Sequence, residues 1–386
     1  MKVFLIAGEP SGDRLGGALM AGLKTLVPDL ACDGIGGPMM QAEGLSSRFD
    51  MDELSVMGIA EVLPRYRQLT RRIRETAQGI IAARPDIVVT IDSPDFCLRV
   101  LRRVRDAAPD IPTVHYVAPT VWAWRPHRAE RMKGLVDHVL TLFPFEPEHM
   151  AKAGIPATFV GHPVVAEPRA TAEEVAAFRA RHGLGDAPLI LALPGSRKSE
   201  VTRLAPIFGE ALRPVLAGRP EARVVLVAAA PVAGLVTDAV RRWPGDPIVI
   251  DPRGQSQGEA EEEKRAAFGA ADVALAASGT VSLELAAAGT PMVIAYDMAW
   301  ISRQIIKTML KIDTVTLVNL VSDTRSVPEF LGANCKPDRI APALTALLDD
   351  PSGQADALRL TMERLGQGGE PPGLRAARAV LATLDT

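Results

Sequence analysis

Cysteine and aromatic residues are scarce in this chain of 386 residues. The three cysteines, Cys32, Cys97 and Cys335, stand far apart, without the short spacings of a zinc site or the paired pattern of a disulfide framework. We therefore expect reduced thiols that belong to the hydrophobic core of a cytoplasmic protein. Aromatic residues make up only 4%, whereas 32 glycines and 31 prolines indicate many turns.

The chain also lacks an excess of charge and a long apolar run. A formal net charge of −3 gives no global attraction to nucleic acid, so none is expected as a partner. No charge-free apolar stretch reaches the roughly 18 residues that span a bilayer. The apolar start, Met1–Ala7, is interrupted by Glu9 and Asp13, which excludes a secretory leader. We expect a protein that does not span the membrane.

What is present is a regular alternation of strand-like and helical segments. With 47% hydrophobic residues the chain is typical of globular proteins, and its length suggests two or three domains. Continuous β-branched runs between helices predict parallel sheets covered on both faces, hence an α/β fold with two doubly wound domains. The predicted strands are Val3–Ala7, Ile87–Ile91, Thr113–Val117, Val139–Phe143, Leu189–Leu193, Val224–Ala228, Ile248–Ile250, Val273–Ala277 and Met292–Ala295.

A domain boundary is expected at Gly161–Pro163 and the Pro/Ala-rich segment that follows. Thr171 and Glu174 then form a capping box that opens the next helix. The acidic stretch Glu259–Lys264 is predicted to be a solvated helix start. A last helix near Gly373–Leu384 fits against either half.

The segment that follows Asp272 is the most informative. The turn Ser278, Gly279 and Thr280 links a buried strand to a helix that ends near Gly289. Its unpaired backbone N–H groups suit a diphosphate, and Glu284, one turn beyond Thr280, can accept the two hydroxyls of a ribose. The alternative is an ordinary strand–turn–helix unit with a surface glutamate.

A second turn of this kind follows the strand Leu189–Leu193. Gly195 lets a backbone approach a ligand, Ser196 is able to cap the helix, and Arg197 offers a bidentate fork for phosphate. A purely structural turn is the alternative here as well.

Two segments of the first half carry candidate chemistry. Gly8–Asp13 follows the first strand and resembles neither a P-loop nor a dinucleotide fingerprint, yet it is suited to hold a sugar or phosphate. In Ile91–Phe96, Ser93 and Pro94 open a helix. Asp95 then falls in the first turn, where the helix dipole explains the presence of an aspartate. The helix start does not explain Asp92, and a carboxylate at the end of a strand is suited to act as a general base. A tight turn and a capping hydrogen bond are the respective alternatives.

Two further segments suggest an anionic or greasy partner. Val117–Arg128 sets two tryptophans beside two arginines and a histidine, which suits an anionic, partly apolar ligand or else a core-packing loop. A basic amphipathic helix over Val62–Arg84, with Arg65, Arg67, Arg71 and Arg72, is of the kind that anionic membrane surfaces attract. Met298–Lys311 has a similar pattern. Either helix is also compatible with simple packing on a core.

Taken together, these segments closely resemble the lipid-A-disaccharide synthase family, bacterial glycosyltransferases of lipid A assembly. The resemblance runs nearly end to end in the motifs Gly8–Asp13, Gly37–Gly44, Val56–Gly58, Ile91–Phe96, Val121–Arg125, Gly161–His162, Leu193–Arg197 and Ala277–Thr280. The chain departs from it at Pro10, where a small residue is expected, and in a longer, more acidic Gln255–Lys264.

The resemblance implies a GT-B fold: residues 1–165, completed by a helix over about 371–386, would bind the acceptor, and residues 166–370 would bind the UDP-sugar. It implies transfer from UDP-2,3-diacylglucosamine to 2,3-diacylglucosamine 1-phosphate (lipid X), giving a β-1,6-linked disaccharide 1-phosphate and UDP. It also implies no cofactor or metal, peripheral association with the cytoplasmic face of the inner membrane, and compatibility with a homodimer.

The resemblance further implies roles for single residues. Asp92 would be the base of an inverting reaction, and Gly195, Ser196, Arg197, Ser278, Gly279, Thr280, Glu284 and Asn319 would bind the nucleotide. The acceptor side would be lined by Glu9, Ser11, Gly12, Asp13, Trp124 and Arg125. Two rival functions remain: another GT-B enzyme, such as an epimerase or a soluble-acceptor glycosyltransferase, and a non-catalytic nucleotide-sugar or lipid sensor. The first would not need two basic apolar helices, and the second would not need Asp92.

Overall fold

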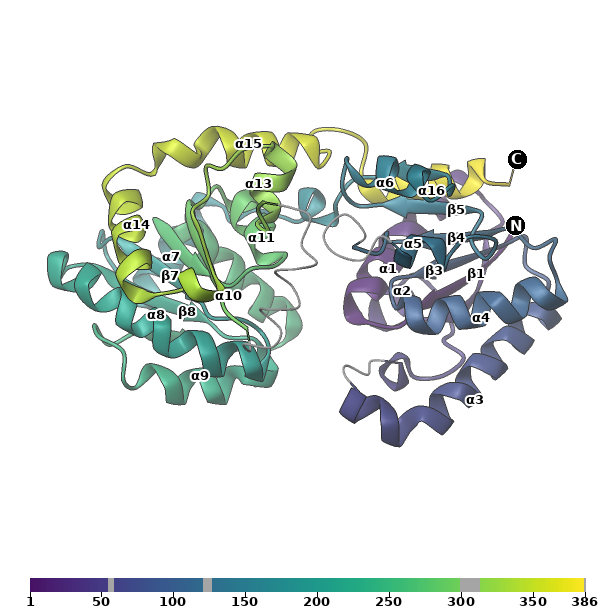
Figure 1. Cartoon of the computed structure of the whole chain (residues 1–386), viewed down its shortest axis with the longest axis horizontal. Helices are drawn as coiled ribbons and strands as arrows, with labels where there is room; N and C mark the ends of the chain where they lie inside the picture. Colours follow the sequence, from purple (N-terminus) through teal and green to yellow (C-terminus); the bar gives the residue numbers. More distant parts are fainter. Residues whose placement is uncertain (55–58, 121–126, 299–312, 385–386) are drawn as a thin grey trace. The chain divides into compact units, whose positions relative to one another are not determined.

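The chain folds into two compact α/β units, seen in a computed structural model (Figure 1). The structure describes residues 1–54, 59–120, 127–298 and 313–384. Unit 1 consists of Met1–Ala166 together with Leu365–Thr386, and unit 2 consists of Glu167–Arg364. The expected boundary at Gly161–Pro163 lies a few residues before this division.

Unit 1 is built on a six-stranded parallel sheet with the strand order β2-β1-β3-β4-β5-β6. Helices α1 and α16 pack together on one face, whereas α3 and α4 pack together on the other. The elements are β1 Lys2–Ala7, α1 Pro10–Leu26, β2 Ala31–Ile35, α2 Pro38–Ala42, α3 Ile59–Ala83, β3 Ile87–Ile91, α4 Pro94–Ala107, β4 Thr113–Tyr116, α5 His127–Glu130, β5 His138–Thr141, α6 Glu146–Lys152, β6 Ala157–Phe159 and α16 Pro372–Ala382.

Unit 2 has a second six-stranded parallel sheet, in the order β12-β11-β10-β7-β8-β9. One core cluster of this unit is mainly aliphatic and includes the aromatic residues Phe208 and Trp243; Phe178 and Phe268 are buried elsewhere in the unit. The elements are α7 Ala172–Arg181, β7 Leu189–Leu193, α8 Lys198–Gly218, β8 Arg223–Val227, α9 Ala233–Val240, β9 Ile248–Ile250, α10 Gln257–Ala270, β10 Val273–Ala276, α11 Val281–Ala288, β11 Met292–Tyr296, α13 Leu317–Ser322, β12 Glu329–Leu331, α14 Pro337–Asp349 and α15 Ala355–Arg364.

Each sheet has one topological switch point, where chain order reverses. In unit 1 it falls between β1 and β3, and in unit 2 it falls between β7 and β10. Ligands of doubly wound sheets bind beyond the carboxyl ends of the strands at such points. The loops that follow these four strands are therefore the expected ligand sites.

The C-terminal helix is part of unit 1 because α16 packs on α1. The two backbones approach so closely that a Cβ on Gly22 would lie 2.5 Å from the carbonyl oxygen of Gly373, and a Cβ on Gly373 would overlap the carbonyl of Ala18. Glycine is required at both positions, since any side chain would force the helices apart.

Every strand predicted from an apolar run is present, within one or two residues of its predicted ends. Three strands were missed, β2, β6 and β12, and all three lie at sheet edges. Edge strands are exposed on one side, so they lack the continuous apolar run on which the prediction depends. The capping box of Thr171 and Glu174 is confirmed by both of its hydrogen bonds.

Two further expectations concern the cysteines and membrane-spanning helices. Cys97 and Cys335 are buried as predicted, whereas Cys32 is only half-buried. None of the helices in the described ranges combines the length with the hydropathy that crossing a bilayer requires.

Candidate functional site

Asp92 lies at the switch point of unit 1, directly after β3, on a strained backbone. Its φ is 53° and that of Ser93 is 43°, two successive left-handed residues without a glycine. Val117, which follows the neighbouring strand β4, has a φ of 85°, which is unusual for a β-branched residue. Strain of this kind persists where the surrounding structure enforces it, and it is concentrated at functional sites.

Hydrogen bonds hold this backbone in place. The N–H of Asp92 donates to the carbonyl of Tyr116 (2.9 Å), and the N–H of Val117 donates to the carbonyl of Leu140 (3.0 Å). Among the residues that the structure describes, the Asp92 carboxylate accepts one bond, from the N–H of Ser93 (2.9 Å), and it remains half-buried. A carboxylate with lone pairs to spare is thus held at the carboxyl edge of the sheet.

Ser93 begins α4 as predicted, but its side chain does not cap the helix. Its hydroxyl oxygen is buried, has no hydrogen-bond partner among the described residues, and lies against Gly8, where a Cβ would be 2.6 Å away. The loops after β1 and β3 therefore meet at Gly8 and Ser93. Asp95 is exposed in the first turn, 3.8 Å from Arg131, in keeping with its structural explanation.

The glycine-rich segment after β1 is the first turn of α1, with Glu9 as its N-cap and Pro10 at its start. Proline is favoured there because its missing N–H has no helical partner in any case, so the unexpected Pro10 fits the backbone. Ser11 is exposed, and Gly12 is buried against Ile91, whose carbonyl a Cβ would approach to 3.3 Å. Glu9, Ser11 and Gly12 therefore lie beside the Asp92 loop.

Asp13 has a structural task. Only 2% of it is exposed, and its carboxylate accepts from the backbone N–H groups of Gly37, Met39 and Met40 at 2.8 to 3.0 Å. These groups begin α2, whose dipole also favours a carboxylate. Asp13 therefore fixes the Gly37–Gly44 motif, and a direct ligand contact would require it to leave these bonds. Trp124 and Arg125 lie outside the described residues.

In unit 2 the two predicted phosphate turns lie next to each other. They follow β7 and β10, adjacent strands in which Leu193 is the register partner of Ala276. The helix after β10 begins and ends as predicted: α11 starts at Val281, and Gly289 caps it with a φ of 78°. The structure thus brings Arg197 and the Ser278–Thr280 turn together at the switch point.

The two turns differ in what their backbone offers. The N–H groups of Ser196 and Arg197 both donate to one carboxylate oxygen of Glu200, at 3.0 and 3.2 Å, and Glu200 itself is buried. The expectation that Ser196 caps this helix is wrong, because Glu200 occupies that role. The guanidinium of Arg197 donates one bond to the other Glu200 oxygen (3.0 Å) and is otherwise exposed.

The turn after β10 is open. Within the described parts of the chain, the N–H groups of Gly279, Thr280 and Val281 have no hydrogen-bond acceptor. Gly279 has a φ of 152°, a conformation that other residues rarely adopt. Of the two turns, the one after β10 therefore retains backbone donors for an anion, and the one after β7 contributes the Arg197 side chain.

Glu284 lies on the first turn of α11 as expected, and it has a partner that sequence reasoning missed. Its carboxylate forms an ion pair with Lys264 on α10, at 2.5 Å. Lys264 belongs to the stretch Glu259–Lys264 that was predicted to be solvated. That prediction is wrong in part, because Glu263 is buried against Arg181 and His182.

Asn319 is also engaged internally. Its side chain is 1% exposed, donates to the carbonyl of Val327 (2.9 Å) and to the hydroxyl of Thr314 (3.3 Å), and accepts from the N–H of Val327 (3.0 Å). This amide holds the start of α13 against the segment before β12. A contact between Asn319 and a nucleotide would therefore involve its backbone or the loop that it positions.

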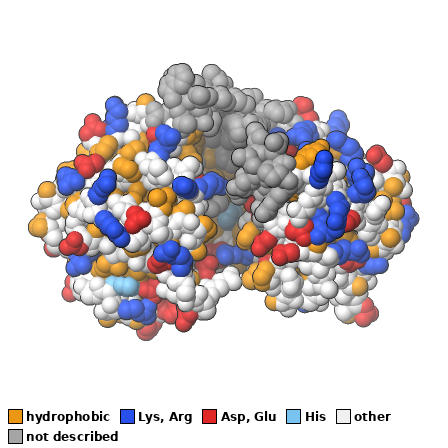
Figure 2. All heavy atoms as spheres, turned by 90° about the horizontal axis from the view of Figure 1, so that it is seen from below, with side chains coloured by type: hydrophobic (Ala, Val, Ile, Leu, Met, Phe, Trp, Pro, Cys, Tyr) orange, Lys and Arg blue, Asp and Glu red, His pale blue; other side chains and the backbone are white. Residues whose placement is uncertain are grey.

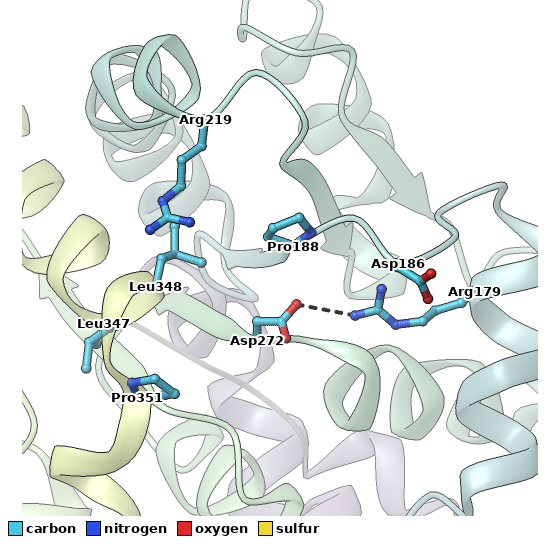
Figure 3. A pocket seen from close by; sticks show the side chains of 8 residues that line it. All are labelled: Arg179, Asp186, Pro188, Arg219, Asp272, Leu347, Leu348 and Pro351. Carbon is cyan, nitrogen blue, oxygen red and sulfur yellow. Dashed lines mark hydrogen bonds and ion pairs between the residues drawn. The ribbon is translucent and has the colours of Figure 1, made fainter.

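A pocket of about 380 Å³ in unit 2 lies at the amino ends of the strands, opposite the loops that follow β7 and β10 (Figure 3). Pro188 and Asp272, which line it, precede β7 and β10. Its Arg179 donates to three backbone carbonyls and to Asp272, and its Arg219 pairs with Asp349. Because both arginines of this pocket already bind groups of the protein itself, we do not assign the candidate site to this pocket. No cluster of three or more His, Cys, Asp or Glu residues suited to a metal ion occurs in the described ranges.

Two six-stranded parallel sheets, each in its own doubly wound unit, give the protein a GT-B fold. Similar solved structures include UDP-GlcNAc 2-epimerase from Neisseria meningitidis bound to UDP-GlcNAc, 13% identical with a TM-score of 0.63 and 100% coverage of both chains. Anabaena Alr3699/HepE in complex with UDP-glucose is 12% identical with a TM-score of 0.61, covering 100% of this chain and 99% of that chain. At these identities the likeness shows the fold alone.

Sequence comparison identifies the family. Residues 3–371 match the lipid-A-disaccharide synthetase family. Lipid-A-disaccharide synthase of Ruegeria pomeroyi is 63% identical, covering 100% of this chain and 96% of that protein, and the one from Rhodospirillum centenum is 46% identical, covering 99% and 94%. The chain belongs to the lipid-A-disaccharide synthase family, and it is a glycosyltransferase of lipid A biosynthesis.

Proposed function

We propose that the protein transfers 2,3-diacylglucosamine from UDP to the 6-hydroxyl of 2,3-diacylglucosamine 1-phosphate, with inversion at the anomeric carbon. Family membership supports the class of reaction, and the two switch points would supply one site for the acceptor and one for the donor. The observation that carries the proposal is the half-buried Asp92 carboxylate, held on strained backbone with one internal hydrogen bond.

In the proposed reaction Asp92 acts as the general base. The acceptor oxygen forms a bond to the anomeric carbon while the bond from that carbon to the diphosphate oxygen breaks. Asp92 takes the hydroxyl proton, and UDP leaves with the electron pair. Attack from the side opposite the leaving group converts an α-linked donor into a β-linked product, and it needs one base on the acceptor side.

Unit 2 would hold the donor. The open N–H groups of Gly279, Thr280 and Val281 and the guanidinium of Arg197 would stabilise the negative charge that develops on the diphosphate. Glu284 would accept the ribose hydroxyls. Gly195, Ser196, Ser278 and Asn319 would shape the surrounding loops, as the hydrogen bonds of Ser196 and Asn319 indicate.

Glu9, Ser11 and Gly12 would line the acceptor side next to Asp92, with Asp13 fixing their neighbour, the Gly37–Gly44 motif. Trp124 and Arg125 are proposed for the same side from their motif. A sugar hydroxyl that donates to the Glu9 carboxylate, or a hydrogen bond between the sugar and the Ser11 hydroxyl, would orient the 6-hydroxyl of the acceptor toward the base.

The acylated substrates reside in a membrane, and we propose that α3 and α4 bind its surface. Along α3, Arg67, Arg71 and Arg74 are exposed on one side, and 55% of Tyr66 is exposed. Arg72 has another role: it pairs with Glu53 at 2.6 Å, stacks on Phe49 and is 18% exposed. The side chain of Arg65 lies outside the described part.

Helix α4 adds to this surface three exposed arginines that sequence reasoning missed, Arg99, Arg102 and Arg103. In the described ranges, neither these three nor Arg67 and Arg74 form an ion pair. Figure 2, which views the molecule from the side of α3 and α4, shows Lys and Arg side chains gathered on unit 1. Each such charge contributes about 1 kcal/mol near an anionic surface.

The decisive experiment measures UDP release and disaccharide formation from the two diacylglucosamine substrates, with chelator present. Asp92→Ala is expected to bind UDP normally and to lose at least a hundredfold in turnover, the usual contribution of a general base. Asp95→Ala, a nearby carboxylate of the same motif, is the matched control and should remain active. Full turnover by Asp92→Ala would contradict the assignment of the base.

The same assay separates the rivals. If the wild-type protein binds UDP-sugar but forms no disaccharide from these lipids, the substrate assignment fails. Formation of an epimerised UDP-sugar would instead favour an epimerase. Activity with a soluble acceptor, independent of acyl chains, would favour a soluble-acceptor glycosyltransferase.

A further inference from the structure

Glu284 is joined to Lys264 by a contact between two helices of unit 2. The Lys264 ammonium lies 2.5 Å from one oxygen, Oε2, of the Glu284 carboxylate. The two side chains are 33% and 27% exposed, so the pair is partly shielded from water but open on one side. Lys264 also lies over the ring of Phe268, 5.6 Å from its centre.

Lys264 differs from its neighbours on α10 in its partner. Arg265, the next residue, pairs with Glu174 on α7 at 2.5 Å, and Glu263 pairs with Arg181 and His182 at the end of the same helix. Those contacts fasten α10 to α7. The bond from Lys264 is directed instead to α11, beside the open N–H groups of Gly279 and Thr280.

Lys264 is protonated at neutral pH. Burial lowers the pKa of Lys264, but the carboxylates of Glu284, Glu261 and Glu167 outweigh this effect and raise the pKa above its ordinary value of 10.5. A cation is thus fixed beside the Glu284 carboxylate, which belongs to the first turn of the helix that follows the open turn.

We infer that Lys264 is a positioning residue for Glu284, and that the pair makes the site selective for a ribonucleoside diphosphate over its 2′-deoxy counterpart. The inference rests on the proposed role of unit 2 in binding the UDP-sugar. It adds a residue and a selectivity to that role.

The physical reason lies in the capacity and mobility of a carboxylate. A glutamate has about four lone-pair positions on its two oxygens. Lys264 takes one on Oε2, which fixes the carboxylate plane and leaves Oε1 and part of Oε2 for two hydroxyls. A free glutamate side chain would lose rotamer entropy when the ribose binds, and here that ordering is already present.

Charge gives a second reason. A nucleoside diphosphate is an anion, and an uncompensated Glu284 beside its binding turn would repel it. Lys264 neutralises that charge, so Glu284 can serve as a hydrogen-bond acceptor without opposing the diphosphate.

The test compares binding of UDP and of 2′-deoxy-UDP to the full chain by calorimetry. The wild type is expected to prefer UDP by about tenfold or more, since a hydrogen bond to a charged group contributes roughly 1.5–3 kcal/mol. Lys264→Gln should lose most of this preference. Lys264→Arg, which keeps the charge, should retain most of it.

Arg265→Gln is the matched control, because it breaks a similarly buried ion pair one residue away that does not touch α11. It should keep the preference for UDP even if its melting temperature falls. A purely structural Lys264 would lower stability as Arg265→Gln does and leave the ratio of the two affinities unchanged.

Glu284→Gln separates this inference from the proposed function. If Glu284→Gln loses the preference and Lys264→Gln keeps it, the ribose contact stands and the role of Lys264 is overturned. If Glu284→Gln keeps the preference, the ribose contact itself fails, and with it the inference.

Discussion

Glu200 anchors the loop that carries Arg197: its carboxylate binds both the backbone N–H and the guanidinium of that arginine, at 3.2 and 3.0 Å. Gly195 makes this possible, since a Cβ there would lie 2.6 Å from the Glu200 side chain. The carboxylate occupies the backbone donors that a phosphate would otherwise use. Arg197 is left as the group that this loop presents.

We therefore predict that Glu200 acts on turnover through Arg197. Glu200→Ala should lower kcat/KM for disaccharide formation by about tenfold, the loss of one charge-assisted hydrogen bond. In a double-mutant cycle, Glu200→Ala combined with Arg197→Ala should be no worse than Arg197→Ala alone. Additive losses would show that Glu200 acts independently of Arg197.

The basic surface of α3 makes a second prediction. Replacing Arg67, Arg71 and Arg74 by glutamine should weaken binding to anionic vesicles by roughly a hundredfold, at about 1 kcal/mol for each charge. The effect should shrink as salt is added, because screening shortens the range of the attraction.

Flotation or co-sedimentation with vesicles measures this binding. Glutamine at the exposed Arg213, Arg241 and Arg242 of unit 2 removes the same net charge and serves as the control. Equal vesicle binding by the two triple variants would refute a specific membrane surface on α3.

Packing of α16 on α1 gives a prediction about stability. Gly22→Val places a side chain against the carbonyl of Gly373, and overpacking of this kind costs about 1–3 kcal/mol. The melting temperature of unit 1 should fall by several degrees. Gly258→Ala, in α10 with open space around it, should be neutral or stabilising; a loss there equal to that of Gly22→Val would contradict the explanation.

Two buried histidines of unit 1 predict a dependence of stability on pH. Burial lowers the pKa of His115 and of His162 to about 4, from an ordinary value of 6.5. Nδ1 of His115 lies 2.7 Å from the Thr90 hydroxyl, and Nδ1 of His162 accepts from the N–H of Val164.

Because the unfolded chain takes up these protons at higher pH than the folded chain does, protonation favours unfolding. The stabilisation is complete above about pH 6.5 and is lost as the pH falls toward 4, by at most roughly 3 kcal/mol for each histidine. Urea unfolding at pH 7 and pH 5 measures the change. His115→Asn with His162→Asn, which keeps an acceptor near each Nδ1, should flatten the dependence, and an unchanged slope would count against it.

The sequence predicted the central strands because a strand buried on both faces must be apolar throughout, as in Leu189–Leu193. It did not predict β2, where Ala31 is exposed and Cys32 and Asp33 are half-buried. The turns at Gly195 and Gly279 were recognisable because their backbone conformations favour glycine.

Which carboxylates are available for ligands was not predictable. The Asp13 carboxylate accepts hydrogen bonds from N–H groups 24 to 27 residues further along the chain. Lys264 and Glu284 form an ion pair between two different helices. Local patterns do not contain such contacts. The capping role of Glu200 could have been recognised from the sequence, since a glutamate three residues after a helix start is a known capping signal.

The division of the chain has a consequence for biosynthesis. Residues 167–364 form a complete sheet and core, whereas the first unit needs α16, made roughly two hundred residues after β6, to cover α1. Domains fold largely as the ribosome releases them. The inserted unit can therefore reach its native state while the first unit still exposes the side of α1 on which Ala18 and Gly22 lie, so the part of this protein that is synthesised first is completed last.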